Sequence, residues 1–197
     1  MAKLYFKYGA MNSGKSTILL QSAHNYEERG MRTVIMKPFL DTKGAGSVVS
    51  RLGVSRTADY LVKSGDSITD IISDDIDRNG SLHCIFIDEC QFLTVPQAEE
   101  LFWIAVEKDI PVICYGLRTD FLTNGFAASA RLLELAHSIE EMKTICRCGK
   151  KAMFNARMIN GKFVFRGRQV AIDNENNVEY ESLCPTCYIR EKRKSEK

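Results

Sequence analysis

An eight-residue segment near the start of the chain restricts the fold more than any other feature. Residues 9–16 read GAMNSGKS and match the phosphate-loop pattern G-x-x-x-x-G-K-[ST]. The segment follows a strand-like stretch, residues 3–8, and opens a helix-like stretch, residues 15–29. Backbone N–H groups of such a loop bind phosphate oxygens, and the dipole of the following helix adds to the attraction. The sequence therefore predicts a nucleotide-binding α/β domain.

The end of a buried strand supplies the second part of the predicted site. Residues 84–87, Cys-Ile-Phe-Ile, are apolar and are followed by Asp88. We expect Lys15 to contact the β- and γ-phosphates, and Ser16 and Asp88 to hold the Mg²⁺ that accompanies ATP. The residues predicted to bind ATP are Gly9, Ala10, Met11, Asn12, Ser13, Gly14, Lys15, Ser16, Asp88, Glu89, Cys90 and Gln91.

Glu89 is the candidate catalytic residue. A carboxylate beside the γ-phosphate can orient and deprotonate a nucleophile. If the nucleophile is water, the protein is an ATPase; if it is a substrate hydroxyl, the protein is a kinase. The chemistry of this segment alone does not choose between them.

The first 145 residues alternate strand-like and helix-like segments. This alternation predicts βαβ units and a parallel sheet covered by helices on both faces. Residues 41–53 contain three glycines and little periodicity, so we expect a loop there. The predicted strands are 3–8, 33–36, 84–88 and 112–115, and the predicted helices are 15–29, 67–76, one beginning with a capping box at Thr94, and 127–136.

Residues 146–191, which we call the annex, differ from the first 145 residues in composition and in the spacing of their strand-like segments. Short strand-like segments alternate with Asn, Gly and Asp, and Asn160-Gly161 is a hairpin signal. The annex is therefore predicted to be β-rich, and a core so small usually needs a staple. The strand-like segments are 152–157, 162–165, 169–172 and 178–180.

Four of the seven cysteines can supply that staple. Cys146 and Cys148 are spaced C-x-C, and Cys184 and Cys187 are spaced C-x₂-C. The odd total and the lack of a secretory signal favour reduced thiols, and four thiolates suit Zn²⁺ in a tetrahedral structural site. Buried free thiols are the alternative. A closed four-sulfur site is structural, so no catalysis is assigned to it.

These features together resemble the type II thymidine kinases, a family of small zinc-containing enzymes. The resemblance rests on GAMNSGKS, on Asp88 to Phe92 (DECQF) and on the two cysteine pairs, and it spans nearly the whole chain. It implies a RecA-like core, a zinc-held lasso domain and ATP-dependent phosphorylation of the 5′-hydroxyl of thymidine in pyrimidine deoxynucleoside salvage. It also implies a homotetramer and feedback inhibition by thymidine triphosphate.

The resemblance also implies roles for individual residues. Glu89 would be the base on the 5′-hydroxyl, and Arg51 would lie near the phosphates. The residues implied to bind thymidine are Phe92, Phe121, Phe126, Val170, Ala171, Ile172, Asp173 and Tyr180. Segments 41–53 and 173–177 are polar and flank the expected cleft, so we expect them to order only when ligands are bound.

The predicted organisation is a nucleotide-binding domain over residues 1–145, a zinc-binding lasso over 146–191 and a charged tail over 192–197. The residues from Arg190 onward are expected to form a solvated, frayed end. No apolar run is long enough for a membrane span, and the first residues do not form a secretory signal. We therefore expect a cytoplasmic protein with no membrane partner.

Two other functions remain open at this point. A RecA-like ATPase acting with nucleic acid is one, because DECQ resembles a helicase motif. A zinc-ribbon module that binds nucleic acid through the basic tail is the other. Against the ATPase, we expect no second RecA-like domain in this chain, and the formal net charge is only +2. Against the zinc-ribbon module, an intact phosphate loop would have no purpose there.

Overall fold

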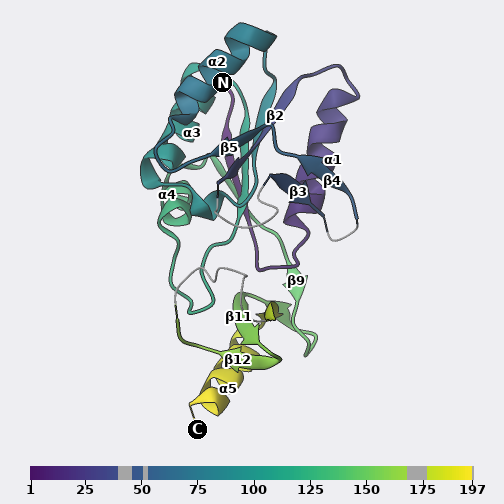
Figure 1. Ribbon diagram of the computed structural model, residues 1–197, viewed down its shortest axis with the longest axis vertical. Coiled ribbons are helices and arrows are strands. Elements are labelled where there is room, and N and C mark those ends of the chain that lie inside the picture. Colours follow the sequence, from purple (N-terminus) through teal and green to yellow (C-terminus); the bar gives the residue numbers. More distant parts are fainter. Residues whose placement is uncertain (40–45, 51–52, 168–176, 197) are drawn as a thin grey trace.

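A six-stranded sheet lies at the centre of the larger part of the molecule (Figure 1). The computed structural model describes residues 1–39, 46–50, 53–167 and 177–196. All neighbouring strands of this sheet run parallel, as predicted. In spatial order the strands are β5 (Tyr60–Val62), β2 (Thr33–Pro38), β6 (Cys84–Ile87), β7 (Val112–Gly116), β1 (Leu4–Tyr8) and β8 (Ser138–Glu141).

Helices cover both faces of the sheet (Figure 1). Helix α1 (Lys15–Glu27) lies on one face, and α2 (Ile68–Asn79), α3 (Val95–Glu107) and α4 (Ala127–Leu135) lie on the other. Alternate residues of each strand point to opposite faces. Val34 and Met36 accordingly pack in the α2–α4 layer, whereas Ile35 packs in the α1 layer. The predicted capping box at Thr94 is present at the start of α3.

The prediction of a loop over residues 41–53 is wrong for part of this segment. Ser47–Val49 form strand β3, which pairs antiparallel with β4 (Ser55–Thr57). Val48 is fully buried in the α1 layer, and this burial stabilises the strand. Residues 41–45, 51 and 52 lie outside the described residues.

The annex lies at one end of the molecule (Figure 1). Its sheet has the order β12-β11-β13, and Asn160 and Gly161 form the predicted hairpin turn with φ angles of 50° and 74°. A short strand, β9, leads from the core into the annex and pairs with β10. The bounds are β9 (Thr144–Ile145), β10 (Lys151–Ala152), β11 (Phe154–Ile159), β12 (Lys162–Val164), β13 (Val178–Leu183) and α5 (Pro185–Ser195).

The prediction of a frayed end from Arg190 onward is wrong for residues 190–195. These residues form the last turns of α5. Pro185 occupies the first helical turn, and basic side chains near the helix C-terminus complement its dipole. Glu191 is buried and pairs with Arg147 of the annex at 2.7 Å and Lys194 at 3.3 Å. Within the described ranges, no helix has the length and apolar content needed to cross a membrane.

Candidate active site

The phosphate loop connects β1 to α1, and its backbone carbonyl groups accept hydrogen bonds from the lysine of the same loop. Gly14 takes a left-handed conformation (φ 80°) immediately before the helix. The Lys15 ammonium donates to the carbonyl oxygens of Gly9 at 3.2 Å and Ala10 at 3.0 Å, and only 9% of this residue is exposed. A Cβ atom at Gly9 would lie 2.4 Å from the Met142 carbonyl oxygen, so this position has no room for a side chain. The loop is therefore shaped by backbone packing as well as by its glycines.

The parallel sheet brings the carboxylate of Asp88 to this loop. Asp88 follows β6, and the Ser16 hydroxyl lies 3.5 Å from its Oδ1 atom. Asp88 is buried, and its burial, together with the nearby Glu89 carboxylate, raises its pKa to about 7. Lys37 and Lys15 act in the opposite direction. The predicted pair of magnesium ligands is thus close together in space although 72 residues apart in sequence.

Glu89 sits at a strained turn between β6 and a short 3-10 helix, η1 (Cys90–Phe92). Its φ of 53° is left-handed, which is uncommon for a residue with a side chain and frequent at functional sites. The Gln91 amide nitrogen donates to the Glu89 carboxylate at 2.5 Å, and the Gln91 amide oxygen accepts from Leu117 N at 3.0 Å. Gln91 therefore links the Glu89 carboxylate to the backbone that directly follows β7.

A cavity of about 440 Å³ lies in front of these residues. Glu89 shares it with the predicted Met11, Asn12, Gly14, Lys15 and Ser16. Ser50 also lines the cavity, and its hydroxyl lies 2.6 Å from the Thr17 hydroxyl. Cys90 and Gln91 are buried and are absent from the described lining. Val49 and Ser50 belong to segment 41–53, which was expected to flank the cleft, and the lining residues that the sequence did not predict are Thr17, Ile18 and Leu117.

The four paired cysteines converge in the annex, as predicted from their spacing. Their sulfur atoms all lie within 4.8 Å of one another, and Cys148 Sγ is 3.6 Å from the sulfurs of both Cys146 and Cys184. Tetrahedral coordination at a metal–sulfur distance of about 2.3 Å requires sulfur–sulfur distances of about 3.8 Å. The four cysteines therefore fit a metal ion.

Comparison with known proteins identifies the family. The model of the TK (thymidine kinase) family matches residues 2–188. A thymidine kinase from Yersinia pestis is 48% identical over 190 residues, which cover 95% of this chain and 95% of the relative. Thymidine kinases from Shewanella oneidensis and Escherichia coli K12 are 47% and 46% identical, covering 93% and 95% of this chain and 95% and 91% of their own lengths. The chain belongs to the thymidine kinase family.

Membership of the thymidine kinase family confirms the prediction of a phosphotransferase. The fold agrees with a solved structure of an ATPase domain at a TM-score of 0.52 and 14% identity, covering 90% of this chain and 80% of that one. That likeness concerns the fold alone and confirms the P-loop α/β class.

The aromatic residues implied to bind thymidine lie near the junction between core and annex. Phe121 and Phe126 are buried, and the Phe126 ring meets Phe92 edge to face at 5.5 Å. The guanidinium of Arg157, from β11, lies 3.7 Å from the centre of the Phe121 ring, and Tyr180 of β13 pairs with Arg157 across the annex sheet. None of the four aromatic residues is among the described residues that line the phosphate cavity. Arg51, Val170, Ala171, Ile172 and Asp173 lie outside the described residues.

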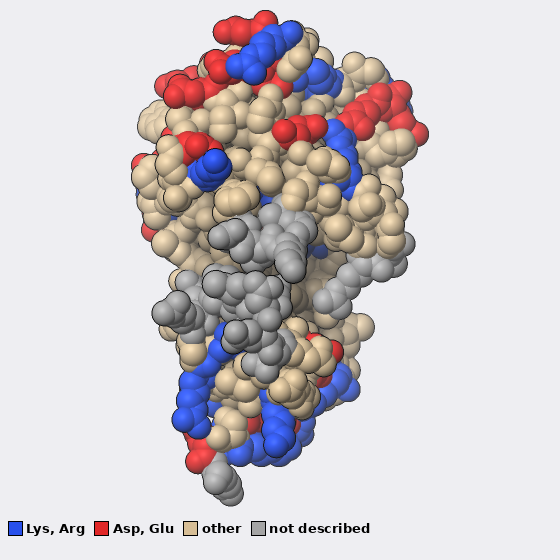
Figure 2. Space-filling view, in the orientation of Figure 1, with Lys and Arg blue, Asp and Glu red and all other residues tan. Residues whose placement is uncertain are grey.

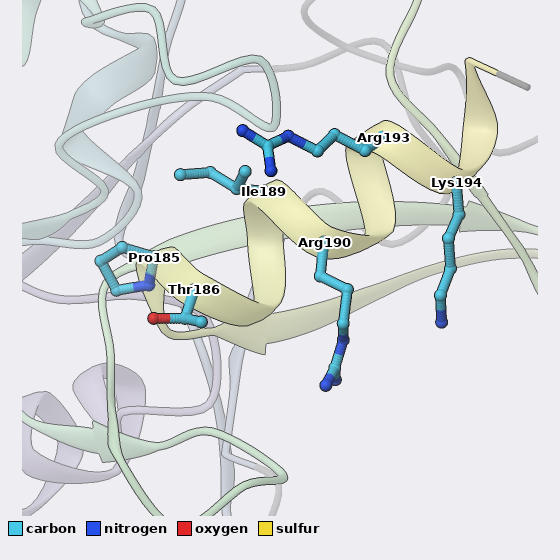
Figure 3. Close-up of a pocket in the computed structure, with 6 residues that line it drawn as sticks. All are labelled: Pro185, Thr186, Ile189, Arg190, Arg193 and Lys194. Atoms are coloured by element: carbon cyan, nitrogen blue, oxygen red, sulfur yellow. The ribbon is translucent and has the colours of Figure 1, made fainter.

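A second hollow, of about 610 Å³, runs along α5 at the far end of the annex (Figure 3). Its described lining comes from one helix and half of it is basic, and Lys and Arg side chains gather at this end of the molecule (Figure 2). The carboxylates and the phosphate loop are not part of it, so we assign it no role in catalysis. Its lining residues are Pro185, Thr186, Ile189, Arg190, Arg193 and Lys194.

Proposed function

We propose that the enzyme transfers the γ-phosphoryl group of ATP to the 5′-hydroxyl of thymidine. The observation that carries the proposal is that Glu89 lines the same cavity as Lys15 and Ser16. A proton acceptor and a phosphate-binding cation on one cavity are what transfer to a hydroxyl requires. The names of the relatives supply the acceptor.

Each residue then has a defined task. The amides of the loop and the Lys15 ammonium bind the β- and γ-phosphates, where negative charge accumulates during transfer. Glu89 accepts the proton of the 5′-hydroxyl while the oxygen of that hydroxyl bonds to the γ-phosphorus. The bond from that phosphorus to the bridging oxygen breaks, and ADP leaves.

The Ser16 hydroxyl and the Asp88 carboxylate would hold Mg²⁺, because Mg²⁺ prefers oxygen ligands and these two groups lie 3.5 Å apart. When bound, Mg²⁺ neutralises charge on the phosphates. The raised pKa of Asp88 fits this assignment, since a buried carboxylate with a like-charged neighbour favours binding of a cation.

We propose Zn²⁺ as the metal of the four-cysteine site, on the basis of its four thiolate ligands and their tetrahedral spacing. The metal would staple the annex, whose segment 170–173 and Tyr180 we propose as contacts for the thymine base. Phe92, Phe121 and Phe126 would complete the base pocket. Arg51 would approach the phosphates.

Regulation, assembly and organisation follow the family resemblance. Thymidine triphosphate carries both a thymine base and a triphosphate, so it would occupy both halves of the site and inhibit. We also propose a homotetramer, a cytoplasmic location and the division into residues 1–145, 146–191 and 192–197.

A panel of nucleosides incubated with ATP and Mg²⁺, scored by mass spectrometry for monophosphates, tests the proposal. We expect thymidine monophosphate to form, with little ATP hydrolysis when nucleoside is omitted. ATP hydrolysis stimulated by DNA without any monophosphate product would instead favour the nucleic-acid ATPase.

A further inference from the structure

Side chains of the annex form hydrogen bonds with the backbone of the phosphate loop. The Met11 amide donates to Asn155 Oδ1 at 2.8 Å, and the Ser182 hydroxyl donates to the Met11 carbonyl oxygen. Thr144, on the strand that leads into the annex, donates from its hydroxyl to the Asn12 carbonyl oxygen at 3.2 Å. Both backbone polar groups of Met11 are therefore held by side chains more than 140 residues away in sequence.

The two groups that hold Met11 are buried and face each other. Asn155 on β11 and Ser182 on β13 are directly opposite in the antiparallel register, and each is 4% exposed. Hydrogen bonds shielded from water in this way are costly to break, because the remaining partner stays buried without a substitute. The two side chains thus form a fixed clamp on one residue of the phosphate loop.

The stretch held in this way includes a residue with a left-handed backbone. Asn12 has a φ of 65°, in the region that residues with side chains disfavour, although Asn less than most. Met11 and Asn12 also line the 440 Å³ cavity. A loop conformation that is locally unfavourable needs support from its surroundings, and the described contacts of the annex supply it.

The same short strands lead to the four-cysteine site. Thr144 is two residues before Cys146, and Ser182 is two residues before Cys184. Met153 N donates to Leu183 O at 2.9 Å, which ties the start of β11 to this junction. Greater mobility of the four cysteines would therefore be passed along the backbone to Thr144 and Ser182, each only two residues away.

We propose that Asn155, Ser182 and Thr144 are positioning residues that hold the phosphate loop in its nucleotide-binding conformation and couple the metal-held annex to ATP affinity. The proposal rests on the proposed function in taking ATP as the nucleotide. Without the clamp, the loop samples more conformations, and binding must restrict them again. The annex thereby acts on the phosphate side of the site as well as on the nucleoside side.

The test measures ATP binding by calorimetry on the full, metal-loaded chain with no nucleoside present. Ser182→Ala removes one hydroxyl and should weaken ATP binding about fivefold, the effect of one hydrogen bond. Ser182→Thr keeps the hydroxyl and should bind ATP more tightly than Ser182→Ala. Ser73→Ala is the matched control, because the Ser73 hydroxyl also donates to a backbone carbonyl, that of Thr69 at 2.8 Å, but on the distant helix α2. It should bind ATP as the wild type does.

A second arm addresses the coupling itself. Removal of the metal from the four-cysteine site, with Mg²⁺ restored before ATP is added, should weaken ATP binding to the wild type, and should have a smaller effect on Asn155→Ala/Ser182→Ala, in which the clamp is already lost. If Ser182→Ala lowers only the thermal stability and leaves the Kd for ATP unchanged, the positioning role is refuted. An ATP Kd that does not respond to removal of this metal in the wild type refutes the coupling.

The two proposals fail separately in this design. Thymidine phosphorylation with unshifted ATP affinities would overturn the clamp alone. The expected ATP shifts in a protein that does not phosphorylate thymidine would overturn the proposed function and leave the clamp standing.

Discussion

Gly116→Ala should damage the active site without touching a ligand. Gly116 ends β7, and a Cβ atom there would lie 2.6 Å from Cys90 Sγ and 2.7 Å from Gln91 Oε1. Ordinary contacts of this kind begin at 3.4 Å, so the Cys90 sulfur must move by about 0.8 Å. Cys90 is fully buried and its sulfur cannot move outward. The displacement therefore passes to the turn that carries Glu89.

The magnitude follows from two effects. Overpacking of a filled interior costs about 1–3 kcal/mol of unfolding free energy. Displacement of a catalytic group by about 1 Å can cost about 10²-fold in rate. We expect a lower melting temperature together with a fall in kcat of about 10- to 100-fold.

Steady-state kinetics and thermal melts of three variants form the assay. Gly65→Ala is the control, because nothing lies within 4 Å of a Cβ atom at that position. Cys90→Ala/Gly116→Ala removes one of the two clashes and should recover part of the lost activity. Normal kcat and stability in Gly116→Ala would refute the packing argument.

Three further predictions concern single side chains. Lys15→Ala should weaken ATP binding about 10- to 100-fold, as expected for a charge-assisted hydrogen bond, while circular dichroism stays unchanged; unaltered ATP affinity would contradict it. Cys148→Ser should lose zinc and hydrogen-exchange protection in the annex but keep protection in the parallel sheet, and full metal content measured by emission spectrometry would argue against the site. Asp88 has a folded-state pKa of about 7 against an ordinary value of 3.8, so the native protein binds more protons between these values and loses stability as pH rises through them. Unliganded Asp88→Asn should therefore melt above the wild type at pH 8 and close to it at pH 4, and an equal difference at both pH values would speak against the burial of this carboxylate.

The phosphate loop, Asp88 and Glu89 were predictable because their chemistry lies in contiguous segments. Their meeting in space was also predictable, since the carboxyl ends of parallel strands share one edge of a sheet. Leu117 follows the predicted strand 112–115 closely and could have been found by the same rule. Ser50 was predicted only as part of segment 41–53, because the residue directly follows β3, a short strand stabilised by tertiary burial of Val48.

Strands β5 and β8 show the limit of sequence patterns. β5 is apolar but has only three residues, which is too short for a pattern to show, and β8 is polar and largely exposed on the edge of the sheet, so it carries no apolar signature. The clamp on Met11 was likewise invisible, because Asn155 and Ser182 resemble ordinary polar residues of a loop-rich annex. Its hydrogen bonds span 144 and 171 residues of sequence, and only the docking of annex on core brings the partners together.

The central claim is that Glu89 accepts the proton of the thymidine hydroxyl during phosphoryl transfer, and single-turnover kinetics of Glu89→Gln test it most directly. The substitution keeps the size of the side chain and removes the proton acceptor, so the transfer rate should fall by about 10²- to 10⁴-fold while the affinities for ATP and thymidine stay close to those of the wild type. Glu107→Gln, an exposed carboxylate at the end of α3, is the control and should transfer at the normal rate. Near-normal transfer of phosphate to thymidine by Glu89→Gln would contradict the account.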